Sequence, residues 1–180
     1  VERNRPYDTF GWGVVLSDQT LDNLRQADPV TGNLIGDALN HWDDIEVFYK
    51  GRSVRSGGHG FCGIGRKRLL NILQARCEEL GVKLVFETEV PDDTAIDADL
   101  VIACDGINSR FRDRLAHAFE PRITLGTARF TWLGSDLPLS AFTFIYKPSP
   151  HGLFVAHAYP FDTPSKVAPG SPVSTFIVEC

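Results

Sequence analysis

The most regular pattern of apolar and polar positions in the chain is helical and follows Arg66. Apolar side chains recur at helical spacing between charged ones, and Gly81 interrupts the pattern. The apolar stripe consists of Leu69, Leu70, Leu73, Cys77 and Leu80. We therefore expect an amphipathic helix over residues 66–80. A second helix is expected after Ser17, whose hydroxyl suits an N-cap.

Other apolar runs have the composition and spacing of strands. Residues 45–50 are rich in β-branched and aromatic side chains, and residues 82–90 alternate between apolar and polar positions. Residues 100–104 form a continuous apolar run, which is typical of a strand covered on both faces in a parallel sheet. A helix, a strand and a buried strand in this order indicate an α/β layer.

Aromatic residues are concentrated in the last third of the chain, between glycine and proline breaks. They are Phe130, Trp132, Phe142, Phe144, Tyr146, Phe154 and Tyr159. This region predicts an antiparallel sheet in another layer or domain. The expected fold is therefore mixed α/β, with a Rossmann-like parallel sheet and helices in residues 1–40 and 62–120. The antiparallel layer is expected in residues 41–61 and 121–180.

Composition narrows the class of protein. The 180 residues are 43% hydrophobic and carry a net charge of −5, which excludes a disordered chain or a disulfide scaffold. The mild acidity argues against a nucleic-acid or anionic-membrane partner. Because no apolar run approaches roughly 20 residues and no signal pattern opens the sequence, we expect a cytoplasmic protein. Four separated cysteines in apolar settings, Cys62, Cys77, Cys104 and Cys180, favour reduced core thiols over disulfides or a metal site.

The sharpest chemical signal is the pair Asp105-Gly106, which follows the apolar run and precedes a helix expected to start around Ser109. Ligands bind at the carboxyl ends of strands in α/β folds. Gly106 lets a phosphate or ribose approach the backbone, and Asp105 can accept hydrogen bonds from hydroxyls. The alternative is a plain strand-to-helix turn in which Asp105 caps the helix.

The stretch around this pair resembles the Asp-Gly motif of the class A FAD-dependent aromatic monooxygenases, the relatives of p-hydroxybenzoate hydroxylase. Asp105, Gly106, Ser109 and Arg112 keep the pattern, and Cys104 departs from it by standing where the family has alanine. Arg66 and Leu69 also resemble the Arg-x-x-Leu start of a helix in this family, and Glu2 looks like the acid that ends its second Rossmann strand.

Residues 6–15, 55–66 and 130–135 resemble a narrower group, the monooxygenase portion of salicylyl-CoA 5-hydroxylase and 2-aminobenzoyl-CoA monooxygenase/reductase. The resemblance implies FAD, with NADH or NADPH as co-substrate. It implies hydroxylation of an aryl-CoA thioester, such as anthraniloyl-CoA or salicylyl-CoA, through a flavin hydroperoxide. It also implies that the chain is an internal piece lacking the phosphate loop, which we expect to be inactive by itself. Residues 1–40 and 62–120 would then bind FAD, and residues 41–61 and 121–180 the substrate.

The same resemblance implies roles for particular residues. Those expected to contact FAD are Glu2, Arg3, Arg66, Val90, Asp105 and Gly106. His59, among five glycines in residues 57–65, is the candidate catalytic residue that orients substrate or flavin, with a structural turn histidine as the alternative. Trp132, Phe142 or Phe144 could line an aryl pocket, but sheet core is the stronger interpretation.

Other functions and partners stay open at this point. A relative that hydroxylates a free phenol or benzoate, and an FAD-binding module without oxygen chemistry, share the Asp-Gly motif. The phosphates of coenzyme A would need a basic group, for which the helix offers Lys67, Arg68 and Arg76, although a solvated helix face explains them as well. A homo-oligomer formed through the full-length parent is also expected to be possible.

Overall fold

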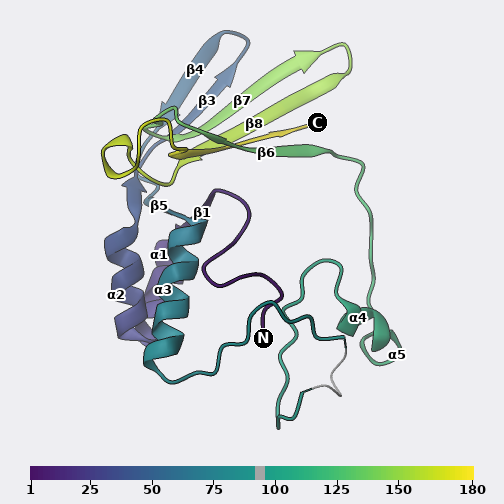
Figure 1. Ribbon diagram of the computed structural model, residues 1–180. Coiled ribbons are helices and arrows are strands. Elements are labelled where there is room, and N and C mark those ends of the chain that lie inside the picture. Colours follow the sequence, from purple (N-terminus) through teal and green to yellow (C-terminus); the bar gives the residue numbers. More distant parts are fainter. Residues whose placement is uncertain (92–95) are drawn as a thin grey trace. The chain divides into compact units, whose positions relative to one another are not determined.

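The computed structural model describes residues 1–91 and 96–180, which divide into two compact units (Figure 1). The smaller unit comprises residues 1–6 and 83–127, and the larger one residues 7–82 and 128–180. The sequence-based division into FAD-binding and substrate-binding parts has other boundaries and stays a prediction.

The larger unit holds most of the regular secondary structure. Its helices are α1 (Asp18–Ala27), α2 (Pro29–Ala38) and α3 (Arg66–Glu79), with a 3-10 turn η2 (Pro164–Lys166). Its strands are β1 (Gly13–Ser17), β2 (Asn40–Trp42), β3 (Ile45–Tyr49), β4 (Arg52–Ser56), β5 (Phe61–Gly65), β6 (Phe130–Ser135), β7 (Phe142–Ser149), β8 (Gly152–Pro160) and β9 (Ser174–Glu179). The smaller unit carries α4 (Arg110–Arg114) and α5 (Ala116–Phe119).

Two sheets organise the larger unit. The small one has the order β1-β5-β2 and is antiparallel. The large one has the order β4-β3-β7-β8-β9-β6 and is antiparallel except where β3 runs parallel to β7. The expected mixed α/β class and the antiparallel sheet in the aromatic-rich region are both confirmed.

The helix starts were predicted well, but one helix face was not. The Ser17 hydroxyl accepts a hydrogen bond from the Thr20 amide at 3.2 Å and caps α1. Helix α3 spans the expected residues, yet Leu73 and Leu80 of the predicted stripe are 38% and 61% exposed. Leu69, which belongs to the predicted stripe, packs against the core as expected, together with Ile72, which does not belong to it. Only one side of α3 faces the core, so the buried face of the helix is narrower than the leucine pattern predicted.

The smaller unit departs from the expected parallel sheet. Residues 82–90 and 100–104 form no strand, and Leu100 and Ile102 are 76% and 77% exposed. Backbone hydrogen bonds join Glu2 to Val85 at 2.8 Å and Glu87 to Asn4 at 3.1 Å, but Glu87 has φ +52 and the register is irregular. Because an apolar run becomes a strand only when neighbours pair its backbone, the run at 100–104 stays irregular.

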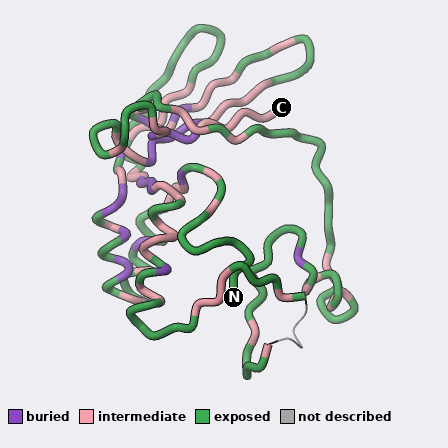
Figure 2. Tube along the Cα trace, viewed as in Figure 1, coloured by how far each residue is buried: buried purple, intermediate pink, exposed green. Residues whose placement is uncertain are grey.

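Burial follows the same division (Figure 2). The main core cluster consists of Leu21, Ile35, Ala38, Leu39, Cys62 and Ile64, all in the larger unit. The four cysteines are free thiols, but the expected core setting is wrong for Cys104 and Cys180, which are exposed. No helix in the described part of the chain is long and apolar enough to cross a membrane.

Candidate functional site

The segment Gly11-Trp12-Gly13 is packed tightly against the large sheet. A Cβ on Gly11 would lie 2.6 Å from the ring of Trp132, and one on Gly134 would lie 2.5 Å from the ring of Trp12. Each indole therefore occupies space that only a glycine leaves free. The two contacts fix the course of the backbone that leads into β1.

Both backbone groups of Gly13 are bonded to side chains of the large sheet. The amide donates to Thr175 Oγ1, and the carbonyl accepts from the Tyr159 hydroxyl, each at 2.9 Å. Burial raises the pKa of Tyr159, so the phenol remains protonated and able to donate at neutral pH. The sequence offered no signal for these contacts because more than 140 residues separate the partners.

Arg66 lies at the start of α3, next to this segment. Its amide donates to the Trp12 carbonyl at 2.7 Å, and its guanidinium lies 4.9 Å from the ring centre of Phe10 and 5.7 Å from that of Trp132. The N-cap of α3 is Gly65, which supplies no side-chain cap. A guanidinium held on aromatic faces beside a helix N-terminus suits an anionic ligand such as a phosphate group.

A row of aromatic rings connects the small sheet to the large one. Neighbouring centroids lie 4.7–6.2 Å apart along the row Trp42, Phe61, Phe142 and Phe144. We call these four residues the aromatic row. His157 adjoins it, 6.3 Å from the ring of Phe144. Trp42 Nε1 is buried and has no hydrogen-bond partner among the described residues, so the row carries a donor that the protein leaves unused.

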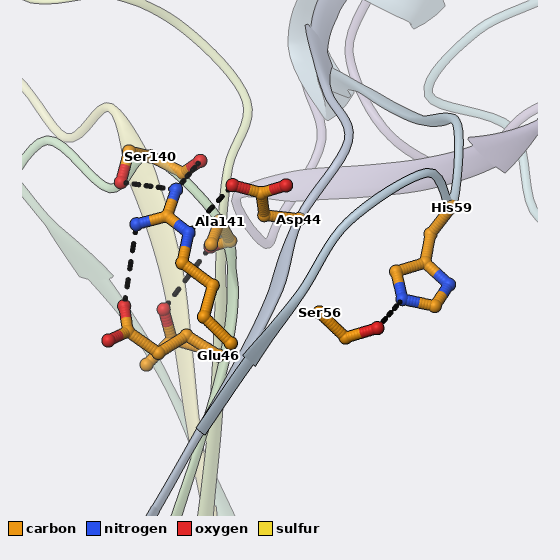
Figure 3. Close-up of polar contacts among 8 residues, drawn as sticks. Asp44, Glu46, Ser56, His59, Ser140 and Ala141 are labelled. Carbon is orange, nitrogen blue, oxygen red and sulfur yellow. Dashed lines mark hydrogen bonds and ion pairs between the residues drawn. The ribbon is translucent and has the colours of Figure 1, made fainter. Parts of the chain in front are cut away.

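His59, the candidate catalytic residue, lies next to Phe61 of this row, and Figure 3 shows its contact with Ser56. Its Nε2 lies 2.9 Å from Ser56 Oγ, its amide donates to the Asp43 carbonyl, and its ring stacks on Phe61 at 6.1 Å. These contacts match the turn histidine weighed as the alternative. The same contacts fix the imidazole ring beside the aromatic row. The role of His59 in orienting substrate or flavin stays a prediction.

An arginine cluster beside His59 was missed by the sequence analysis. Arg55 Nε donates to Asp44 Oδ2 at 2.6 Å, and one terminal nitrogen reaches the carbonyl and hydroxyl of Ser140 at 3.3 Å. Glu46 completes the cluster at 3.8 Å (Figure 3). Arg55 thereby joins β4 to the turn before β7 and steadies the strand that leads to His59. The short strand Arg52–Ser56 contains two arginines, and nothing in its sequence indicates that Arg55 would have such a role.

Asp105 acts as a helix cap in the smaller unit. Its Oδ2 accepts from the Arg110 amide at 2.9 Å, and the pKa of this carboxyl is lowered, first by the Ser109 hydroxyl and then by backbone amides. Ser109 caps α4 by accepting from the Arg112 amide, as its position predicted. Gly106 has φ +84, which explains the glycine. A contact of Asp105 with FAD stays a prediction beside this observed capping role.

The residues expected to hold FAD fall into both units. Glu2, Arg3, Val90, Asp105 and Gly106 belong to the smaller unit, whereas Arg66 belongs to the larger one with His59. The smaller unit also contains a cavity of about 440 Å³. It is lined by Val101, Ile102, Ala103, Ser109, Phe111, Arg112, Leu115 and Phe119. This cavity is mainly apolar, with one guanidinium and one hydroxyl in its wall.

Solved structures identify the class to which this fold belongs. The chain matches PqsL of Pseudomonas aeruginosa, described as a probable FAD-dependent monooxygenase, with a TM-score of 0.64 at 16% identity over 99% of this chain and 52% of that one. It matches 2,6-dihydroxypyridine-3-hydroxylase of Arthrobacter nicotinovorans with a TM-score of 0.66 at 17% identity over 98% and 48%. At such identities the likeness concerns the fold alone, which is that of FAD-dependent monooxygenases.

Sequence relatives narrow this class. The chain is 46% identical over 179 residues to salicyloyl-CoA 5-hydroxylase of a Streptomyces species, covering 99% of this chain and 33% of the relative. It is 34% identical over 174 residues to 3-hydroxy-4-methyl-anthranilyl-[aryl-carrier protein] 5-monooxygenase of Streptosporangium sibiricum, covering 97% and 47%. The resemblance seen in the sequence is thus confirmed: over nearly its whole length the chain is similar to part of proteins named as aromatic monooxygenases. It spans a third to a half of these relatives, and no protein-family model matches it.

Proposed function

We propose that the whole protein carrying this chain is an FAD-dependent monooxygenase that hydroxylates the ring of an aryl-CoA thioester, using NADH or NADPH and O₂. The observation that carries this proposal is the 46% identity to salicyloyl-CoA 5-hydroxylase over almost the entire chain. The fold shared with FAD-dependent monooxygenases supports the same conclusion.

The residues present fit FAD chemically. The cofactor needs cations and amides for its pyrophosphate, and Arg66 beside the uncapped start of α3 offers both. It needs acceptors for ribose hydroxyls, which the carboxylates of Glu2 and Asp105 provide. The lowered pKa of Asp105 keeps that carboxylate ionised at neutral pH. Bound FAD supplies the redox and oxygen chemistry, while the protein positions the ring and excludes water.

The larger unit supplies groups suited to an aromatic substrate. Phe142 and Phe144 stack at 4.7 Å and would hold an aryl ring by offset stacking. His59, fixed through Nε2 by Ser56, leaves Nδ1 to hydrogen bond a phenol or amine substituent. In this proposal His59 orients the substrate ring, and the aromatic row forms the wall on which the ring lies.

The test is to purify the whole protein and supply it with salicylyl-CoA or anthraniloyl-CoA. The protein should retain about one FAD per chain, oxidise NADH or NADPH only when the thioester is present, and release a hydroxylated thioester. A protein that neither retains nor regains FAD contradicts the proposal. Oxidation of the nucleotide without a hydroxylated product would favour an FAD-binding module lacking oxygen transfer.

A second candidate is hydroxylation of a free aromatic acid. It is favoured by the structural match to PqsL in complex with 2-aminobenzoylacetate, which is not a thioester, at a TM-score of 0.68. Comparing kcat/KM for free salicylate and anthranilate with the values for their thioesters separates the two candidates. A homo-oligomer also stays a prediction, and a neighbour, 2-methyl-3-hydroxypyridine-5-carboxylic acid oxygenase, is described in a tetrameric form. Light scattering on the whole protein tests that prediction.

A further inference from the structure

Two hairpin turns leave the large sheet at the same end. Strands β3 and β7 run parallel, with Tyr49 opposite Tyr146. Both strands therefore enter their hairpin turns, β3–β4 and β7–β8, beyond this pair and at the same end of the sheet (Figure 1). Exposed basic side chains occupy both turns and the residues beside them: Lys50, Arg52, Lys147 and His151. We call these four residues the cationic rim; its formal positive charges are those of Lys50, Arg52 and Lys147.

The residues of β3, β4, β7 and β8 around the two turns carry no carboxylate, and the acid at the same level of the sheet is Glu179 of β9, opposite Val155 and 3.9 Å from His157. Residues 47–54 and 144–157 contain no Asp or Glu, although the chain as a whole has a net charge of −5. Within the described residues none of the four rim side chains has an ion pair, whereas Arg55, further along β4, is held by Asp44 and Glu46. A concentrated positive charge on an acidic protein indicates an anionic ligand.

Lys50 occupies a position that does not favour lysine. It lies in the left-handed region with φ +47, followed by Gly51 with φ +75, in a two-residue turn where asparagine and glycine are preferred. Its ammonium lies 5.2 Å from the ring centre of Tyr49. The turn conformation therefore does not account for a lysine at this position, and its ammonium over the Tyr49 ring is available to an anionic ligand.

One face of the sheet leads from the aromatic row to Arg52 of the rim, whereas Lys147, which follows Tyr146 on β7, lies on the opposite face. By strand register, Arg52 lies opposite Tyr49, Tyr49 opposite Tyr146, and Tyr146 two residues from Phe144 on the same face. Ser149 lies five residue steps beyond Phe144 along β7, which is roughly 17 Å at the usual rise of a strand. An elongated ligand with an aromatic group at one end and phosphates at the other would follow this face.

We propose that the cationic rim binds the phosphate groups of coenzyme A, with the pantetheine arm lying along β3 and β7 and the aryl group on the aromatic row. This inference rests on the proposed function. The guanidinium of Arg52 can donate two hydrogen bonds to one phosphate, and the flexible side chain of Lys50 adds a further positive charge. Of the helix cations considered from the sequence, Arg76 fits less well, because it is engaged by Asp28 at 2.9 Å and Glu79 at 3.1 Å.

The test compares two thioesters in the whole protein. In the double variant K50Q/R52Q, KM for the aryl-CoA should rise about tenfold while kcat stays near the wild-type value, since exposed charge contacts contribute severalfold each. The KM for the aryl-pantetheine thioester, which lacks the nucleotide phosphates, should not change. The matched control is Lys166→Gln, which removes an exposed cation in η2, away from the rim.

A second readout needs no turnover. Adenosine 3′,5′-bisphosphate should bind the wild-type protein, with affinity falling as salt rises, and should bind K50Q/R52Q about tenfold more weakly. Equal affinity in both proteins, or equal losses for both thioesters, overturns the proposal. Turnover of the aryl group only on an acidic carrier protein also overturns it, in favour of a protein partner. A wild-type protein that binds the bisphosphate but retains no FAD contradicts the proposed function and leaves the rim supported.

Discussion

The two units have similar apolar runs but very different packing. In the larger unit, β5 is paired on both sides, and Cys62 and Ile64 are fully buried. In the smaller unit, the still more apolar run at residues 100–104 is paired by no strand among the described residues and is largely exposed. Apolar composition therefore supplies the driving force for burial, while strand partners decide whether burial occurs.

The largest expected effect breaks the core of the larger unit. Ile35 is completely buried and contacts the main core cluster, so Ile35→Ala should lower the free energy of unfolding by about 2–5 kcal/mol. Ile102→Ala is the matched control, because Ile102 is 77% exposed, and it should change stability by less than about 0.5 kcal/mol. Denaturant titration followed by tryptophan fluorescence reports on the larger unit, where Trp12, Trp42 and Trp132 lie, so its midpoint should fall in Ile35→Ala and stay unchanged in Ile102→Ala.

A somewhat smaller effect is expected from a glycine that contacts an indole. Gly11 has φ +88, and a Cβ there would lie 2.6 Å from Trp132, so Gly11→Ala should destabilise the larger unit by about 2–4 kcal/mol. Gly106 has nearly the same φ, +84, but no described atom lies within 4 Å of its added Cβ. Gly106→Ala should therefore cost about 1–2 kcal/mol from backbone conformation alone. Equal losses would show that crowding at Gly11 is unimportant.

The next prediction concerns function in the smaller unit. Asp105→Ala in the whole protein should weaken FAD retention roughly tenfold, because a charged hydrogen-bond acceptor is lost, while tryptophan fluorescence reports an intact larger unit. The ratio of bound FAD to protein measures the effect. Asp105→Asn keeps the size and one acceptor of the side chain and should retain more FAD. Unchanged FAD content in both variants would leave Asp105 with its capping role only.

Local signals in the sequence predicted the fold better than contacts between distant segments. The Ser17 cap, the span of α3 and the start of α4 after Ser109 depend on neighbouring residues, and the structure confirms each of them. The strand at 100–104 depended on partners that the pattern could not supply, and it was wrong. The Asp105-Gly106 motif led to the resemblance that the relatives confirm, but no sequence signal indicated the bonds of Gly13 to the large sheet.

The smallest expected effect is a pH dependence that reports on the helices of the larger unit. Asp28 caps α2 and accepts from Arg76 at 2.9 Å, and these contacts, with the Arg76 bond as the main cause, lower the pKa of Asp28 well below its ordinary value of 3.8. The charged form is therefore favoured by folding. The stability that the ionised Asp28 contributes to the folded protein is complete above about pH 5. It is lost as the pH falls below 3.8 towards the lowered pKa of Asp28 in the folded state.

Asp28→Asn keeps an oxygen for the helix cap and removes the charge, so it should lower stability at pH 7. It should also flatten the loss of stability between pH 4 and pH 2, which is roughly the range over which Asp28 is protonated on unfolding. Arg76→Gln should flatten the same region, because Arg76 is the main cause of the shift. Thermal unfolding at a series of pH values measures both variants. The ion pair Arg110–Glu89 of the smaller unit, with both side chains more than half exposed, provides the contrast. Arg110→Gln should leave the acid profile of the tryptophan signal unchanged, and a profile that changed as much as in Asp28→Asn would contradict the assignment to Asp28.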